Sequence, residues 1–231
     1  MLTPHVPQRG VTLIELAIGL SITAIVIAAG VPSFMEWMQN AQVRTAAESL
    51  QSGLQLARGE AVRRNLPVIF QLTDSLANSC AVSTSGTSWV VSLSPAASKC
   101  GNAPAEPPAS TADWDSSDPS WPYIVRTGST SEGALNAKVS SSEVVVSGTA
   151  AYAGSIVFNG WGRVSTASLG TGNSVRIDIT NPQLGTCLAS NPPGTGEKVR
   201  CLRLLVSSTG QIQMCDPYLK VIDPTAPGAC P

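Results

Sequence analysis

The residues best suited to chemistry in this 231-residue chain are six cysteines, and their spacing favours disulfide bonds over a metal site. All six lie after residue 79, no two form a C-x-x-C pair, and the chain has a single histidine. Zinc sites usually need four closely arranged Cys or His ligands. Disulfides form in oxidising compartments, so this pattern predicts a protein exported from the cytoplasm. The cysteines are Cys80, Cys100, Cys187, Cys201, Cys215 and Cys230.

The remaining polar residues do not form the pattern of an enzyme. The only histidine, His5, lies in the first ten residues, where we expect a leader to be removed. Ser-His-Asp and Cys-His catalysis would then lack their base, and the common serine-hydrolase motifs are absent. An acidic loop could hold a cation, but such loops are usually only solvated. We therefore expect no enzyme activity, cofactor or metal. The acidic loop contains Asp113, Asp115 and Asp118.

One carboxylate, Glu15, lies at the start of an apolar segment. Residues 16–35 contain no charged side chain, and twenty helical residues span about 30 Å, the thickness of a membrane's hydrocarbon core. Arg9 before the span predicts a cytoplasmic N-terminus and a translocated remainder. A secretory signal peptide would share the cationic start and the apolar core. It would not explain Glu15, because a carboxylate at membrane depth costs roughly 3 kcal/mol and is functional by default.

These N-terminal residues resemble the start of type IV prepilins: a leader ending in Gly10, Glu15 five positions after it, and Pro32 at the twenty-second position. The resemblance implies that a prepilin peptidase cuts between Gly10 and Val11, that Val11 is then N-methylated, and that Glu15 acts in assembly. Val11 departs from the family, which usually has phenylalanine there. Physically, the Glu15 carboxylate could neutralise the new amine of Val11 in its own or a neighbouring subunit. A cleaved signal peptide or a plain signal anchor is the alternative.

The helical pattern continues beyond the apolar segment and becomes amphipathic. Asn65 and Pro67 predict its end, since asparagine tolerates a left-handed cap and a residue before proline disfavours helix. Gly30 with Pro32 suggests a kink or local unwinding. The apolar positions recur at spacings of three and four: Val43, Ala47, Leu50, Leu54, Ala57 and Ala61.

From residue 67 onward the pattern changes to short runs with β-strand character, separated by turn residues. One long helix followed by such runs predicts an α+β fold, with the helix packed on antiparallel sheet. Residues 94–122 are rich in Pro, Ala, Ser and Asp, and we expect a surface loop there, partly ordered by Trp114 and Trp121. The expected strands are 68–73, 88–93, 123–126, 143–146, 155–158, 175–180, 200–206 and 211–214.

Short motifs in these runs are similar to the GspH/FimT family of minor pilins and pseudopilins. The resemblance implies a long N-terminal helix, with a transmembrane half and an amphipathic half, packed on two small antiparallel sheets. It also implies a subunit of a type IV pilus or of a type II secretion pseudopilus. Both assemblies remain open, as does a position at the tip or along the shaft. The motifs are Trp89-Val90-Val91, Ile156-Val157-Phe158 before Asn159-Gly160, Arg176-Ile177-Asp178-Ile179, and the segment from Arg203 to Cys215.

The resemblance and the composition together divide the chain into four parts. Its partners are expected to be the prepilin peptidase and, through residues 11–64, other pilins or pseudopilins. The protein would sit in the bacterial inner membrane with a single span before it enters a filament. The parts are a leader (1–10), a transmembrane helix (11–35), an amphipathic helix (36–65) and a periplasmic β-rich domain (66–231).

The pairing of the cysteines is open, because six cysteines allow fifteen connectivities. The simplest pairs sequence neighbours, each closing a loop of about 15 to 20 residues that stabilises the fold by about 3 kcal/mol. These pairs are Cys80 with Cys100, Cys187 with Cys201, and Cys215 with Cys230.

DNA binding for uptake in transformation is the alternative function, because some relatives bind DNA through arginines near the C-terminus. Lys198 and Arg200 are the candidate contacts here, and Arg203 lies on the same strand face as Arg200. The turn where an arginine pair would be expected instead has Gln211 and Gln213. The formal net charge of -1 also gives no bulk attraction to nucleic acid, so we expect a structural subunit.

Overall fold

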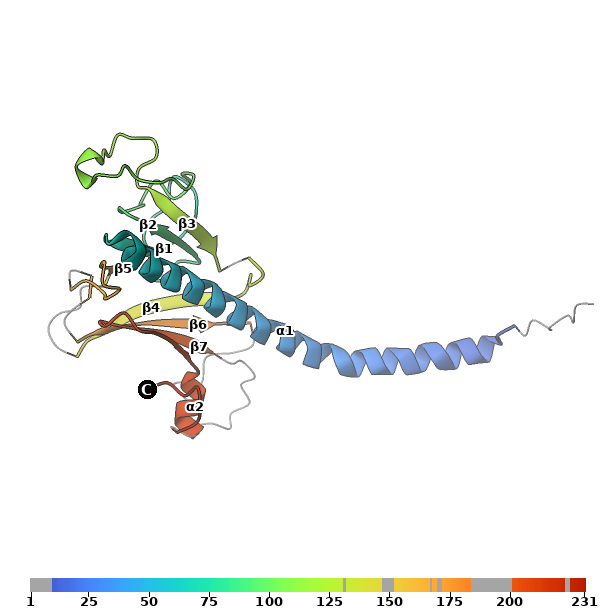
Figure 1. Cartoon of the computed structure of the whole chain (residues 1–231). Coiled ribbons are helices and arrows are strands. Elements are labelled where there is room, and N and C mark those ends of the chain that lie inside the picture. Colours follow the sequence, from blue (N-terminus) through green and yellow to red (C-terminus); the bar gives the residue numbers. More distant parts are fainter. Residues whose placement is uncertain are drawn as a thin grey trace, which may run out of the picture. The chain divides into compact units, whose positions relative to one another are not determined.

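The computed structural model describes residues 10–130, 132–146, 152–166, 168–169, 172–183, 201–222 and 225–231. Its first element is helix α1, Leu13–Arg64 (Figure 1). The helix is continuous through Gly30 and Pro32 and does not unwind there, because one proline removes a single backbone hydrogen bond while the neighbouring turns keep theirs. The chain forms two compact units, Met1–Met38 and Gln39–Pro231, and α1 runs from the first into the second.

Helix α1 ends at the residue that the sequence predicted. Asn65 has a φ of 52°, the left-handed conformation of a C-terminal cap. The Leu66 N–H donates to the Ala61 carbonyl at 3.3 Å, and the Asn65 N–H donates to the Val62 carbonyl at 3.4 Å. These two bonds form a Schellman motif, which satisfies the last carbonyls of the helix and turns the chain into the first strand.

Two antiparallel sheets of four strands each follow the helix, and they confirm the predicted α+β fold. The first sheet has the order β3-β2-β1-β5, with β1 at Val68–Thr73, β2 at Ser88–Ser92, β3 at Ile124–Ser129 and β5 at Ser155–Phe158. The second has the order β4-β6-β7-β8, with β4 at Lys138–Val144, β6 at Ser174–Thr180, β7 at Leu202–Ser207 and β8 at Ile212–Cys215. A 3-10 helix, Thr111–Asp113, and helix α2, Pro217–Ile222, complete the described elements.

Strand β4 lies earlier than the sequence suggested. We expected a strand at residues 143–146, but β4 covers Lys138–Val144 and pairs with β6 along its whole length. The segment contains only two apolar residues, Val139 and Val144. Its strand conformation therefore comes from hydrogen bonding to β6 and not from an apolar alternation that sequence analysis can detect.

The core of the second unit lies between α1 and both sheets (Figure 1). Trp89 of β2 is 4% exposed, and its indole N–H donates to the Ser49 hydroxyl of α1 at 3.1 Å. Gly128 of β3 leaves room for this ring, since a Cβ there would overlap it. Several of the helix residues are alanines, which allow the backbone of α1 to approach the sheets closely. The helix contributes Val43, Ala46, Ala47, Leu50, Leu54, Ala57 and Ala61.

Part of the long segment at residues 94–122 packs against the sheet and is not a free surface loop. The Ala96 N–H donates to the Gln71 side-chain oxygen at 2.7 Å, and both residues are buried. Trp114 and Trp121 each place their rings 5.6 Å from that of Tyr123, which is fully buried. The two tryptophans therefore order this segment, and a small second core lies beneath it. That core contains Cys80, Val90, Ala96, Cys100 and Ile124.

Two disulfides join sequence neighbours. One links Cys80, which precedes β2, to Cys100 in the long segment that follows β2. The other links Cys215 to Cys230 and holds the C-terminal segment against the end of β8. Cys201 is also disulfide-bonded. Cys187 lies outside the described residues, so its pairing with Cys201 stays a prediction.

Candidate processing and assembly site at the N-terminus

The residues after the expected cleavage point form the first turn of α1. The Thr12 N–H and hydroxyl donate to Glu15 Oε2 at 2.9 and 2.8 Å, and the Glu15 N–H donates to Thr12 Oγ1 at 3.3 Å. This reciprocal arrangement is a capping box, in which each side chain satisfies a backbone donor of the first turn. The sequence analysis missed it, although the T-x-x-E spacing of residues 12–15 is its signature.

Both hydrogen bonds that Glu15 accepts from Thr12 go to one carboxylate oxygen, Oε2. Among the described residues no donor contacts the other oxygen, Oε1. Gly10 and Val11 directly precede the cap and are exposed. The carboxylate therefore closes its own helix and still has an acceptor for a second group, such as an amine.

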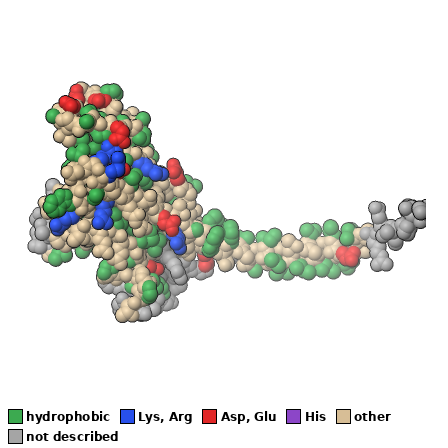
Figure 2. Space-filling model, in the orientation of Figure 1, with side chains coloured by type: hydrophobic (Ala, Val, Ile, Leu, Met, Phe, Trp, Pro, Cys, Tyr) green, Lys and Arg blue, Asp and Glu red, His purple; other side chains and the backbone are tan. Residues whose placement is uncertain are grey.

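Between Leu16 and Met35, helix α1 carries no charged side chain and is predominantly apolar on all sides. Leu13 and Ile14 are 85% and 67% exposed, and the apolar side chains that follow them are also mostly exposed. Figure 2 shows hydrophobic side chains along this half of α1, with an acidic group near its start. Among the described helices, α1 is the one long and apolar enough to cross a membrane. Water does not favour such a surface, so lipid or other apolar helices must cover it.

The aspartates of the acidic loop accept hydrogen bonds from residues of the same loop and stabilise its turns. The Asp115 carboxylate accepts the Ser117 hydroxyl at 2.6 Å and the Ser117 N–H at 2.8 Å. These hydrogen bonds lower the pKa of Asp115, the contact with the Ser117 hydroxyl most strongly. Asp118 accepts the Ser120 N–H at 2.7 Å. Within the described part of the chain, no three His, Cys, Asp or Glu side chains are grouped as metal ligands.

Both candidate DNA contacts, Lys198 and Arg200, lie outside the described residues. The structure does describe Arg203, which lies on the same predicted strand as Arg200. Arg203 Nε donates to Asp178 Oδ1 at 2.6 Å across the β6–β7 pair. Arg176 Nε lies 3.1 Å from Asp178 Oδ2, an ion pair without the alignment of a hydrogen bond. Arg203 donates directly to the Asp178 carboxylate, which neutralises its charge. Arg203 is therefore not a free cation for a phosphate.

Two family models match parts of the chain. Residues 46–210 match the family model of the type II transport protein GspH, and residues 7–31 match the prokaryotic N-terminal methylation motif. Two crystal forms of the type IV minor pilin FimU of Pseudomonas aeruginosa are similar in structure. The P21 form is 16% identical with a TM-score of 0.42, and the match covers 77% of this chain and 91% of that one. The P65 form is 15% identical with a TM-score of 0.38, covering 74% and 90%.

No curated protein matches the chain. The family model nevertheless covers well over half of the sequence, including most of both sheets. The methylation motif covers the leader junction, the capping box and most of the apolar half of α1. The chain belongs to the GspH family and carries the prokaryotic N-terminal methylation motif ahead of its GspH domain.

Proposed function

We propose that this protein is a minor pilin or pseudopilin that a prepilin peptidase cuts between Gly10 and Val11. Residues 1–10 are the leader, residues 11–35 span the inner membrane, and residues 36–65 join the span to the periplasmic domain of residues 66–231. After cleavage Val11 is N-methylated, and the subunit enters a type IV pilus or a type II secretion pseudopilus. The observation that carries this proposal is the methylation motif on an exposed apolar helix that continues into a GspH domain.

The exposed apolar half of α1 explains how the subunit can lie first in the membrane and then in a filament. Before assembly, lipid covers the side chains of residues 11–35, and the helical conformation lets the backbone form its hydrogen bonds within the segment. In a filament, the same surface packs against the helices of neighbouring subunits. Neither step requires the helix to refold, because the same continuous α1 serves both environments.

Glu15 supplies specificity within this apolar surface. Cleavage after Gly10 would create a positive amine on Val11, four residues from Glu15 and beside the capping Thr12. Inside a bundle of apolar helices an unpaired amine is costly, whereas a carboxylate with an open oxygen neutralises it. We infer that Glu15 Oε1 pairs with the Val11 amine of a neighbouring subunit while Oε2 retains the cap.

The disulfides support the periplasmic assignment of the GspH domain. Cys80–Cys100 and Cys215–Cys230 both lie in the second unit, and oxidising compartments maintain such bonds. The described residues give no observation in favour of a DNA receptor, because Arg203 is paired with Asp178.

Sequencing of the N-terminus of the membrane-derived protein tests the proposal. The mature chain is expected to begin at Val11, and to retain its leader in cells that lack the prepilin peptidase. The matched control is Gly19→Ala, which changes a glycine with open space around it in the middle of the apolar segment and should leave cleavage unchanged. A mature terminus beyond residue 25 would show that a conventional signal peptidase acts and would refute the proposal.

A further inference from the structure

A tryptophan stands exposed on a turn of the second unit that the proposed assembly chemistry does not use. Trp161, in the turn after β5, is 82% exposed. The Asn159 side-chain oxygen accepts the N–H groups of Trp161 and Arg163 at 3.0 and 3.1 Å. The Asn159 N–H donates to the Arg163 carbonyl at 2.9 Å, and the Gly162 N–H donates to the Asn159 carbonyl at 2.8 Å. Four hydrogen bonds therefore fix the backbone that carries the indole.

The turn also packs tightly against the C-terminal end of α1. Arg58 Nε donates to the Gly162 carbonyl at 3.2 Å. Gly162 has a φ of +73°, and a Cβ there would lie 3.1 Å from the Val62 side chain. A Cβ on Gly160 would lie 3.0 Å from Asn65 Cα and closer still to its side-chain oxygen. Trp161 is thus held on a rigid support between two glycines that have no room for side chains.

Apolar and cationic side chains flank the turn that carries the indole, and among the described residues the cations have no acidic partner. Val62 is 52% exposed, and Arg58 and Arg163 are exposed as well. Among the described residues, no carboxylate lies within ion-pair distance of Arg58 or Arg163. The nearby Glu60 is occupied by Arg63 and Arg64. We call Arg58, Val62, Trp161 and Arg163 the Trp161 patch.

The patch lies at the C-terminal end of α1. Arg58 and Val62 belong to the last two turns of the helix, and the Asn65 cap packs against Gly160 of the turn.

We propose that the Trp161 patch docks another protein subunit of the same filament, one that offers an apolar pocket beside exposed carboxylates. The assignment rests on the proposed function, which supplies the filament. Tryptophan and arginine are the residues most enriched in the energetically dominant centres of protein interfaces. A rigid turn loses little conformational freedom on binding. The guanidinium groups of Arg58 and Arg163 have no carboxylate partner in the described part of the chain, and they complement carboxylates of the partner.

A nucleic acid fits this surface less well than an acidic protein. Phosphate binding needs several aligned cations, whereas the patch has two.

Photo-crosslinking in the living bacterium tests the proposal on the full chain. A benzophenone amino acid replaces Trp161 in one strain and Leu135, which is 80% exposed, in a control strain. Irradiation is expected to link position 161, but not position 135, to a second protein that carries its own N-terminal methylation motif. The pair Arg58→Glu and Arg163→Glu should lower the adduct yield about tenfold or more. Arg126→Glu, at an exposed arginine of β3, is the matched control and should leave the yield unchanged.

For each variant, disulfide formation and the N-terminal sequence are also determined. Arg163→Glu alone serves if Arg58→Glu disturbs the turn, because the Arg163 side chain makes no hydrogen bond or ion pair with the residues that the structure describes. A normal Val11 terminus with no adduct at position 161 overturns the docking proposal and leaves the proposed function intact. An adduct that is insensitive to charge reversal, contains only a second copy of this chain, or is removed by nuclease overturns it as well. A chain that is never cut after Gly10 overturns both proposals.

Discussion

Glu15 combines two roles that can be separated at the level of single atoms. Its Oε2 closes the capping box with Thr12, while its charge is the feature that assembly would use. A glutamine at this position can still cap the helix but carries no charge. An alanine loses both properties.

We therefore expect Glu15→Ala and Glu15→Gln to give membrane-bound, disulfide-bonded subunits that enter filaments poorly. Thr12→Ala should weaken the first turn by about 1 kcal/mol and leave incorporation nearly normal. Incorporation is measured as the fraction of subunit in sheared or purified filaments. If Glu15→Gln assembled normally while Glu15→Ala did not, the cap and not the charge would be the property that assembly requires.

Two tryptophans in the second unit allow a matched comparison of how each side chain contributes to the free energy of unfolding. Trp89 is 4% exposed in the core, whereas Trp161 is 82% exposed. We expect Trp89→Ala to lower the free energy of unfolding by about 3–5 kcal/mol, since it leaves a cavity between α1 and the first sheet. Trp161→Ala should change it by less than about 0.5 kcal/mol. Thermal unfolding of the purified full chain in detergent measures both, and an equal loss from the two variants would contradict the assignment of Trp161 to a binding surface.

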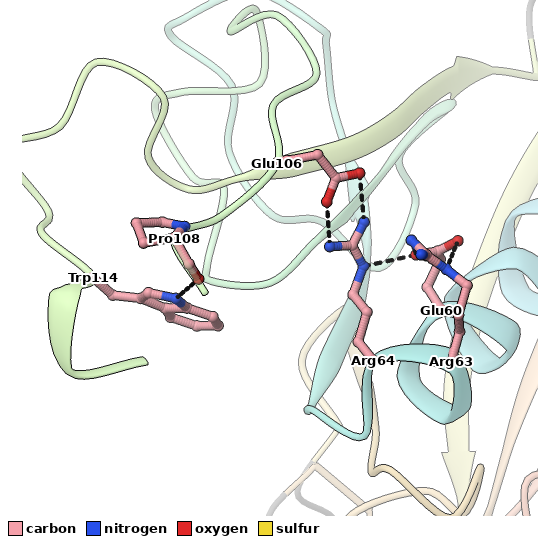
Figure 3. Close-up of polar contacts among 6 residues, drawn as sticks. All are labelled: Glu60, Arg63, Arg64, Glu106, Pro108 and Trp114. Atoms are coloured by element: carbon pink, nitrogen blue, oxygen red, sulfur yellow. Dashed lines mark hydrogen bonds and ion pairs between the residues drawn. The ribbon is translucent and has the colours of Figure 1, made fainter. Parts of the chain in front are cut away.

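At the scale of elements, Arg64 links the end of α1 to the long segment before β3 (Figure 3). Its guanidinium contacts both oxygens of Glu106, at 2.6 and 3.0 Å, and Glu60 Oε2 at 2.7 Å. The Arg64 side chain is only 11% exposed. In the same region Trp114 donates to the Pro108 carbonyl at 3.4 Å. The loop is thus attached to the helix by an ion pair and by its own aromatic packing.

This network predicts an acid-sensitive contact. A hydrogen bond from Arg63, and then one from Arg64, lower the pKa of Glu60, and Arg64 likewise lowers the pKa of Glu106. Carboxyls whose folded-state pKa is lowered stabilise the fold above their ordinary value of 4.5, and this stability is lost as the pH falls below it. Arg64→Gln should therefore cost about 1–2 kcal/mol near neutral pH and reduce the loss of stability on acidification.

Thermal unfolding at about pH 6 and about pH 3.5 measures that difference. Arg44→Gln is the control, because the Arg44–Glu48 pair is exposed at both ends and should contribute little. Limited proteolysis should cut residues 94–122 faster in Arg64→Gln than in Arg44→Gln. Identical acid sensitivity of the two variants would show that the Arg64 network does not hold the loop.

At the scale of the whole molecule, the two units have opposite solvent requirements. The first exposes apolar side chains along its length, whereas the second holds its own core between α1 and two sheets. A chain that begins at Gln42 keeps every α1 residue of that core, from Val43 to Ala61. We expect it to fold and to remain in solution without detergent, whereas a chain that begins at Val11 should require detergent.

The same shortened chain tests the state of the cysteines after periplasmic expression. Thiol alkylation followed by mass spectrometry should find no modified cysteine before reduction, because the described cysteines are disulfide-bonded. Cys80→Ser with Cys100→Ser should lower the free energy of unfolding by about 3 kcal/mol. Free thiols, or zinc that copurifies with the domain, would contradict the disulfide assignment.

The sequence by itself determined the features that depend on local pattern. The apolar run, the Gly10–Glu15 spacing and the cap at Asn65 are properties of neighbouring residues, and α1 begins and ends accordingly. Six of the predicted strands agree with the structure to within two residues at both ends, because each contains a short run rich in apolar residues: 68–73, 88–93, 155–158, 175–180, 200–206 and 211–214. The T-x-x-E capping signal was equally local, although the sequence analysis overlooked it.

Only the tertiary structure decided the features that depend on contacts between distant segments. Strand β4 has few apolar residues and takes its position from pairing with β6. Gln71 is buried because Ala96, 25 residues later, covers it, and Arg203 is neutralised because β6 places Asp178 beside it. The Trp161 patch joins α1 to a turn 104 residues further along the chain, through the contact between Arg58 and Gly162. Such juxtapositions leave no periodic trace in the sequence, since each depends on how the sheets pack against α1.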